Sequence, residues 1–334
     1  MEEKIDELIR HYFKDHPSYE MEPVPFGLTN LTKLIRINEE KYIARIYNPH
    51  TKSEQSIRLE SNITSFLSQM NLSFKVPVFL QTLTGEEYIE FADGTFGALI
   101  AFLEGSVPEL TTLQHAADFG RVVGEISAAL DQYNTDRLEY RGISFLDIYA
   151  LHPLASVENV KSFMEQPPFH IPEANLKFYR EMILLVNQSI NQLKELPFQL
   201  VHHDLLIFNL LAKDNQIGAV LDFDFTSIDV SFMELAISLN HVLQMADGNL
   251  VMTEAFIKGY GAYRKGSSQE IKQLQLLTQV YHLAILHIYI GQHYAGGQEV
   301  EQNFNYILNQ FFDRNEWLNQ NQSTMQQLLE SYIL

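Results

Sequence analysis

Cysteine is absent from all 334 residues of the chain. Without thiols the protein can form no disulfide, hold no metal through a thiolate and use no cysteine nucleophile. Basic residues are also scarce, since 23 lysines and arginines face 42 acidic residues, which gives a formal net charge of −19. Because nucleic acids and anionic membranes attract basic proteins, we expect neither as a partner. The acid excess favours an amine-bearing small molecule instead.

Long apolar runs are missing as well. The most apolar stretch, YHLAILHIYIGQHY at 281–294, carries three histidines. It is shorter than the roughly 20 residues that a membrane helix needs. The first residues, MEEKIDELIRHYF, lack the basic and apolar regions of a signal peptide. Because the absence of cysteine also fits a reducing compartment, we expect a cytoplasmic protein.

The residues that are present predict a globular protein with more than one lobe, because 46% of the chain is hydrophobic. Helical spacing of apolar residues predicts a first helix at 2–14 and a second at 53–70, with Ser53 as its N-cap. Alternating and β-branched runs predict five strands around the second helix. These strands cover residues 31–37, 41–47, 76–82, 86–91 and 96–103. The first 103 residues therefore predict a small sheet carrying one main helix.

The remaining chain follows a mostly helical pattern. Long helices are predicted at 112–133 and 174–193, and helical spacing continues from 231 to 333. Two short strands are predicted between them, at 209–213 and 217–223. We therefore predict an α/β (α+β) protein of two lobes, with residues 1–103 in the N-terminal lobe and 104–334 in the larger C-terminal lobe.

Polar residues interrupt the apolar stretch LVHHDLLIFNLLAKDNQIGAVLDFDF, residues 200–225. Buried polar groups cost free energy unless they are paired or used. If the two short strands form a hairpin, Asp204, Asn209 and Asp222 converge at its open end. One carboxylate can then accept a hydroxyl proton, while the asparagine oxygen and the other carboxylate hold Mg²⁺. Phosphoryl transfer to an alcohol needs this arrangement.

The same residues carry a family resemblance. His202, Asp204 and Asn209 give H-x-D-x-x-x-x-N, and Asp222 follows in LDF. This resembles the aminoglycoside phosphotransferase and choline kinase group, whose pattern is H-G-D-x-x-x-x-N followed by I-D-[FW]. The resemblance implies a bilobal, protein kinase-like fold with a nucleotide-binding N-terminal lobe and a catalytic C-terminal lobe. It also implies ATP and Mg²⁺ as cofactors, a small-molecule hydroxyl substrate, Asp204 as the catalytic base, and Asn209 and Asp222 as metal ligands.

The resemblance extends to a nucleotide site in the N-terminal lobe. The turn GLTN, which ends at Asn30, looks like the family's G-x-[ST]-N turn over the nucleotide. Arg45 stands where the family places a cation for the α- and β-phosphates, and Glu60 stands where its partner acid is expected. The segment IAFLEG looks like the hinge, so that backbone groups from Ala101 to Leu103 would meet adenine.

A narrower resemblance lies downstream in LDFDFTSIDVSFMELAISLN. It looks like the homoserine kinase branch, which reads I-D-F-x-F, then an Asp, then D-L-A-I. Asp229 matches the later Asp, and Glu234 stands where the branch has Asp, a place from which an acid can order the catalytic loop. His202 is expected to brace that loop. Asp224 is either a second metal contact or a solvated turn acid.

Three readings of function stay open. The first is an ATP-dependent kinase of homoserine, choline, ethanolamine, a methylthio-sugar or an aminoglycoside. The alternative is a non-catalytic nucleotide-binding regulatory module, against which the complete set of Asp204, Asn209 and Asp222 argues. A protein kinase is disfavoured because no glycine-rich loop precedes Arg45. Tyrosines and histidines of the stretch 281–294 could line a substrate pocket, or simply pack.

Overall fold

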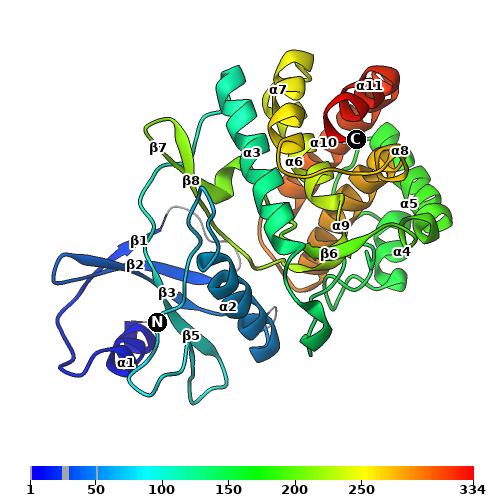
Figure 1. Ribbon diagram of the computed structural model, residues 1–334. Helices are drawn as coiled ribbons and strands as arrows, with labels where there is room; N and C mark the ends of the chain where they lie inside the picture. The colour runs from blue at the N-terminus through cyan, green and yellow to red at the C-terminus, as the bar shows by residue number, and fades with distance from the viewer. Residues whose placement is uncertain (1, 25–29, 50–51) are drawn as a thin grey trace.

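The structure of the protein, a computed structural model, describes residues 2–24, 30–49 and 52–334. Figure 1 shows a small N-terminal lobe of strands and two helices beside a larger helical lobe. The small lobe holds an antiparallel sheet of five strands in the order β1-β2-β3-β5-β4. Its elements are α1 (Glu2–Tyr12), β1 (Glu20–Pro23), β2 (Leu31–Ile37), β3 (Glu40–Ile46), α2 (Glu54–Ser68), β4 (Ile89–Glu90) and β5 (Phe96–Ala101).

The central hairpin of this sheet forms because its turn residues accept unusual backbone angles. Asn38 and Glu39 join β2 to β3 with φ of 48° and 71°, the left-handed conformation that two-residue hairpin turns need. Alternate residues of both strands are then buried on one face, and Ile35 and Ala44 pack there against Leu8 of α1. The sheet is thereby fixed as a platform on which β3 presents Arg45.

Helix α2 lies between the sheet and the helical lobe (Figure 1). Ser53 caps it in a reciprocal capping box with Ser56, as the sequence predicts. One face of the helix, including Leu59, Ile63 and Leu67, belongs to the same hydrophobic core as the C-terminal lobe. The helix that carries Glu60 is therefore packed firmly against the large lobe as well as the small one.

The C-terminal lobe is a helical bundle with two small antiparallel ribbons. Its closest packing joins α3 to α7, where a Cβ on Gly120 would come within 2.0 Å of the Phe256 carbonyl oxygen, so only glycine fits. The strand pairs are β6–β9 and β7–β8. Its α-helices and strands are α3 (Leu113–Leu130), α4 (Val157–Glu165), α5 (Glu173–Leu193), β6 (Phe198–Val201), β7 (Leu210–Lys213), β8 (Gln216–Val220), β9 (Ser227–Val230), α6 (Met233–Met245), α7 (Leu250–Gly261), α8 (Ser268–Lys272), α9 (Leu274–Tyr294), α10 (Val300–Gln320) and α11 (Gln322–Ile333).

Backbone bonds hold the β7–β8 hairpin at two points, one in the small lobe and one in the segment that follows β5. Lys75, after α2, donates its N–H to the Gly218 carbonyl oxygen at 2.8 Å and accepts from the Val220 N–H at 2.9 Å. Ser106, after β5, exchanges two bonds with Ala212 at 2.8 and 3.1 Å. The hairpin is thus held by Lys75 from the small lobe and by Ser106 at the start of the large lobe.

The structure confirms the bilobal, kinase-like α/β fold and corrects some of its elements. Residues 76–82 form no strand but a single bridge between Phe79 and Ile100, and 86–91 shortens to β4. Pro77 explains the first error, because proline has no N–H for a ladder. The ribbon β6–β9 was not predicted, since strands of four residues show too little alternation to be recognised. No helix in the described part of the chain is long and apolar enough to cross a membrane.

Candidate active site

The β7–β8 hairpin brings together residues that lie far apart in the sequence. The Leu221 N–H donates to the Asn209 carbonyl oxygen at 2.8 Å, so the two ends of the hairpin meet. The Asn209 side chain then donates its Nδ2 to the carboxylate Oδ2 of Asp204 at 2.7 Å and to the Asp204 carbonyl oxygen at 2.9 Å. Asp204, Asn209 and the segment that carries Asp222 therefore form one cluster.

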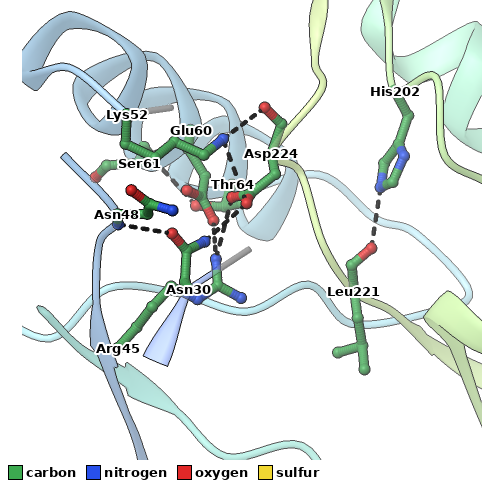
Figure 2. Close-up of polar contacts among 10 residues, drawn as sticks. All are labelled: Asn30, Arg45, Asn48, Lys52, Glu60, Ser61, Thr64, His202, Leu221 and Asp224. Carbon is green, nitrogen blue, oxygen red and sulfur yellow. Dashed lines mark hydrogen bonds and ion pairs between the residues drawn. The ribbon is translucent and has the colours of Figure 1, made fainter. Parts of the chain in front are cut away.

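His202 fixes this cluster from inside the fold, as the sequence predicts. Its Nδ1 accepts the Asp204 N–H at 3.2 Å. The other ring nitrogen, Nε2, lies 3.0 Å from the Leu221 carbonyl oxygen and must donate to it, as the close-up in Figure 2 shows. Burial lowers the pKa of His202 to about 3, so the ring is neutral and links both halves of the motif.

Asp222 is held in an arrangement that costs free energy. Its φ is +62°, which is rare for a residue other than glycine. Its Oδ1 is buried and has no hydrogen-bond partner among the described residues. Burial, together with the charge of Asp224, raises the pKa of the Asp222 carboxyl. An unpaired carboxylate oxygen in such a place can bind a cation.

The donor set fits magnesium better than a transition metal. The described residues contain no group of three or more histidines and acids placed to hold a metal. Mg²⁺ usually binds through one or two protein carboxylates, with substrate phosphates and water completing its shell. Asp222 provides the carboxylate, and the amide oxygen of Asn209 is left over once its Nδ2 donates to Asp204. Hard oxygen ligands of this kind suit a hard cation.

Two buried acids support the loop that runs from His202 to Asn209. The Glu234 carboxylate accepts the backbone N–H of His202 at 2.6 Å, and burial raises the pKa of Glu234 to about 7. Asp229 accepts the Phe145 N–H at 2.6 Å. The same carboxylate lies 2.9 Å from Nε2 of His203. Both acids contact the loop from behind, where the sequence places them.

His203 belongs to this support and is not exposed to a ligand. Its side chain is 0% exposed, and its φ of +68° is strained. Nε2 faces the Asp229 carboxylate and Nδ1 faces the Phe225 carbonyl oxygen at 3.2 Å. Nδ1 also lies 3.5 Å from the Ser227 hydroxyl oxygen. His203 therefore makes its polar contacts inside the protein and packs behind the loop.

The N-terminal lobe contributes a network of charged groups, shown in Figure 2. Arg45 from β3 and Glu60 from α2 form an ion pair, with Nη1 and Oε1 at 2.8 Å. Glu60 is 3% exposed and is therefore no ordinary surface acid. Burial acts to lower the pKa of Arg45, but the carboxylates of Glu60 and Asp224 outweigh it and raise that pKa well above its usual value. The guanidinium is held charged at the lobe interface.

Asp224 joins the two lobes. Its carboxylate lies 3.4 Å from Nη1 of Arg45 and 3.3 Å from Nζ of Lys52, and accepts from Nδ2 of Asn30 at 2.8 Å. Burial acts to raise its pKa, but the charges of Lys52 and Arg45 prevail and lower it. With 3% of its side chain exposed, Asp224 is not the solvated turn acid of one sequence reading.

Lys52 is the residue that sequence reasoning missed. Its ammonium also donates to the Asp224 carbonyl oxygen at 2.8 Å, across 172 positions of sequence. A lysine in the loop before a helix N-cap carries no pattern, so nothing in the sequence distinguishes it from a solvated residue. The structure places a second cation beside Arg45, and both contact the carboxylate of Asp224.

The structure shows only part of the contacts that the sequence predicts for the nucleotide, at the segment after β5 and at the GLTN turn. The Ala101 N–H donates to the Val78 carbonyl oxygen at 2.9 Å, so this group cannot also bind a base. Leu103 follows the end of β5 and lies in the connection between the lobes. Of the GLTN turn, only Asn30 is among the described residues, where its Oδ1 also accepts the Asn48 N–H at 3.1 Å.

The aromatic residues of α9 divide into two groups. Tyr281 and Tyr289 lie on the side of Asp204, and both burial and the charge of Asp204 raise their pKa values. Tyr294 instead donates to the Asn159 carbonyl oxygen at the surface. His287 is buried and bonds the Ile148 carbonyl oxygen through Nδ1 at 2.9 Å. His287 and Tyr294 therefore bond within the protein, as the packing alternative for this stretch expects.

Comparison with known proteins agrees with this arrangement. Residues 20–271 match a family model described as the phosphotransferase enzyme family. The chain is 22% identical to a homoserine kinase of Methylobacillus flagellatus over 253 residues, 75% of this chain and 73% of that protein. It is 24% identical to a homoserine kinase of Methylobacterium radiotolerans over 255 residues, 76% of this chain and 74% of that protein.

Solved structures show the same fold at low sequence identity. An amicoumacin kinase in complex with AMP-PNP and Ca²⁺ superimposes with a TM-score of 0.69 and 16% identity, covering 94% of this chain and 93% of that one. A microcompartment-associated aminopropanol kinase superimposes with a TM-score of 0.65 and 13% identity, covering 98% of this chain and 99% of that one. A choline/ethanolamine kinase family protein from Mesorhizobium loti superimposes with a TM-score of 0.64 and 11% identity, covering 99% of both chains.

Proposed function

Because the chain belongs to the phosphotransferase enzyme family and is a small-molecule kinase, we propose that it moves the γ-phosphoryl group of ATP to a hydroxyl of a small molecule. The observation that carries this proposal is the cluster of Asp204, Asn209 and Asp222 at the open end of one hairpin. In the proposal, residues 1–103 bind the nucleotide, and residues 104–334 carry the catalytic groups and the acceptor.

Asp204 is the group proposed to receive the acceptor hydroxyl. Burial, and then the charge of Asp222, raises its pKa well above the usual value. A more basic carboxylate is a better proton acceptor at neutral pH. Asn209 holds one of its oxygens, Oδ2, at 2.7 Å, so the direction of the carboxylate is set before an acceptor arrives. Asp204 thus orients the hydroxyl and takes its proton as the phosphoryl group is transferred.

Positive charge for the phosphates is proposed to come from two sources. Asn209 and Asp222 would hold Mg²⁺, which would supply positive charge to neutralise the phosphates. Arg45, held by Glu60, would position the α- and β-phosphates, with Lys52 as a second cation beside it. Backbone groups between Ala101 and Leu103 would meet the base. Positioning and charge neutralisation then supply most of the rate.

The role proposed for Lys52 is tested by replacing it with methionine, which keeps the length of the side chain and removes its charge. We expect nucleotide affinity to fall about tenfold, because a charge-assisted hydrogen bond contributes roughly 1.5–3 kcal/mol. Titration with AMP-PNP and Mg²⁺ measures this. Lys161→Met serves as the control, since the side chain of Lys161 is 70% exposed on α4. Equal affinities of the two variants would contradict the role.

The proposed reaction is tested by ADP release from ATP and Mg²⁺ across a panel of hydroxyl compounds. The panel holds homoserine, choline, ethanolamine, methylthioribose and several aminoglycosides. We expect at least one acceptor to raise ADP release in the wild type and not in Asp204→Asn. Tight nucleotide binding without turnover for any compound would instead indicate the non-catalytic regulatory module.

A further inference from the structure

A small cavity opens beside the catalytic loop. It has a volume of about 130 Å³ and lies among α6, α9, α10 and the loop that joins Asp204 to Asn209. Leu206 and Phe208 line it from that loop, and Tyr281, whose pKa responds to the charge of Asp204, lines it from α9. The cavity therefore borders the loop that carries the proposed catalytic base, although Asp204 itself does not line it.

Residues that line this cavity carry polar atoms that the protein itself does not satisfy. Four of the lining residues each have a buried side-chain atom without a hydrogen-bond partner in the described part of the chain. These atoms are Nε of Arg314, Oδ1 of Asn240, Nε2 of His241 and Oε1 of Gln310. Each such atom costs roughly 1–3 kcal/mol, and folded proteins leave few of them. Four in one cavity indicate a polar ligand.

The cavity carries a positive charge although the whole protein is strongly acidic. Arg314 is the only charged side chain among the described residues that line it, and no aspartate or glutamate is present there. Burial lowers the pKa values of His241 and His282 to about 4, so both rings are neutral. Burial also lowers the pKa of Arg314, yet an arginine keeps its charge at neutral pH.

Arg314 itself is held in place but has no acidic partner. Its Nη1 donates to the Leu243 carbonyl oxygen at 2.5 Å, which fixes the guanidinium at the end of α6. Asp247 and Asp313 raise its pKa from a distance, but none of the ion pairs found among residues 2–24, 30–49 and 52–334 includes Arg314. A buried, oriented and unpaired guanidinium is suited to a planar anion such as a carboxylate.

We propose that this cavity is the acceptor site and that the acceptor is a small hydroxy acid, whose carboxylate binds Arg314. This inference rests on the proposed kinase function and names its substrate class. Oxygens of Asn240 and Gln310 accept hydrogen bonds from an ammonium or hydroxyl of the same molecule. A hydroxy amino acid satisfies both kinds of partner.

Size and charge separate this class from the other acceptors. A cavity of about 150 Å³ holds one benzene molecule, so a volume of about 130 Å³ suits a molecule of roughly that size. An aminoglycoside is several times larger. Choline fits by size but brings a fixed positive charge to Arg314. The cavity therefore favours an anionic group, whereas the net charge of −19 favours an amine-bearing cation.

The test measures binding by calorimetry without ATP, so its outcome does not depend on phosphoryl transfer. The ligands are L-homoserine, 4-hydroxybutanoate, 3-aminopropan-1-ol and choline, which differ in the carboxylate and the amine. We expect L-homoserine to bind the wild type at least tenfold more tightly than 3-aminopropan-1-ol. Arg314→Gln is expected to abolish this difference, and Arg314→Lys to retain part of it. Arg180→Gln, which changes an exposed arginine on α5, should behave as wild type.

Binding of AMP-PNP by each variant verifies that it is folded. Equal binding of L-homoserine and 3-aminopropan-1-ol by the wild type would overturn the proposal, as would an unchanged preference in folded Arg314→Gln. Absence of binding by both carboxylate ligands would also overturn it. Phosphoryl transfer to choline alone would reject the hydroxy acid and leave the kinase function standing. Binding of L-homoserine without phosphoryl transfer to any acceptor would reject the kinase function and leave the hydroxy-acid site standing.

Discussion

Replacement of Asp204 by asparagine is expected to lower kcat by about 10²–10⁴-fold, the contribution typical of a positioned general base. The change is nearly isosteric, and the new amide oxygen can still accept the hydrogen bond from Nδ2 of Asn209. Folding and nucleotide binding should therefore persist while proton acceptance is lost. Steady-state kinetics with the best acceptor, together with AMP-PNP titration, measure the two effects separately.

The matched control for this variant is Asp214→Asn. Asp214 lies at the exposed turn of the same β7–β8 hairpin with a φ of +54°, a conformation that asparagine also adopts. We expect wild-type kcat from the control. If Asp204→Asn retained full kcat, the base would have to be another group, and the cluster would serve only to bind the nucleotide.

Replacement of Asp222 by asparagine is expected to raise the Mg²⁺ concentration needed for nucleotide binding at least tenfold, and to reduce kcat by orders of magnitude. Asparagine tolerates the φ of +62°, whereas alanine would add backbone strain to the loss of the ligand. Titration of AMP-PNP binding against Mg²⁺ measures the metal requirement. An unchanged Mg²⁺ requirement would show that the metal binds elsewhere.

The same variant should gain stability while it loses activity. The folded-state pKa of Asp222 is raised, first by burial and then by the charge of Asp224. Its stabilising contribution is therefore complete below the unfolded pKa and is lost as pH rises through the folded pKa. At neutral pH and without metal, the charged carboxylate destabilises the fold, so Asp222→Asn should raise Tm. A lower Tm at neutral pH would contradict this account.

The sequence predicts the catalytic cluster because the motif is local. Asp204, Asn209 and Asp222 lie within one loop and hairpin, so strand pairing alone brings them together. The pairing of Arg45 with Glu60 follows from the kinase-like resemblance, and the structure contains that ion pair. The roles of these residues in binding and catalysis stay predictions.

Other parts of the site could not be predicted because they depend on distant contacts. Lys52 contacts Asp224 only because the two lobes pack together. Neither the residue type of Lys52 nor its spacing in the sequence predicts this contact. The role proposed for Arg314 depends on a cavity that three helices and a loop form together. The contacts that bury His203 come from Phe225 and Asp229, 22 and 26 positions away in the sequence. Tertiary packing, which sequence patterns do not encode, decides each of these cases.

The β7–β8 hairpin keeps the proposed metal ligands together independently of the small lobe. Asn209 precedes the hairpin, Asp222 follows it, and the bond from the Leu221 N–H to the Asn209 carbonyl oxygen joins the two ends. The contacts of Asp224 with Arg45 and Lys52 instead connect the two lobes. A separation of the lobes would therefore break these ion pairs without changing the spacing of Asn209 and Asp222.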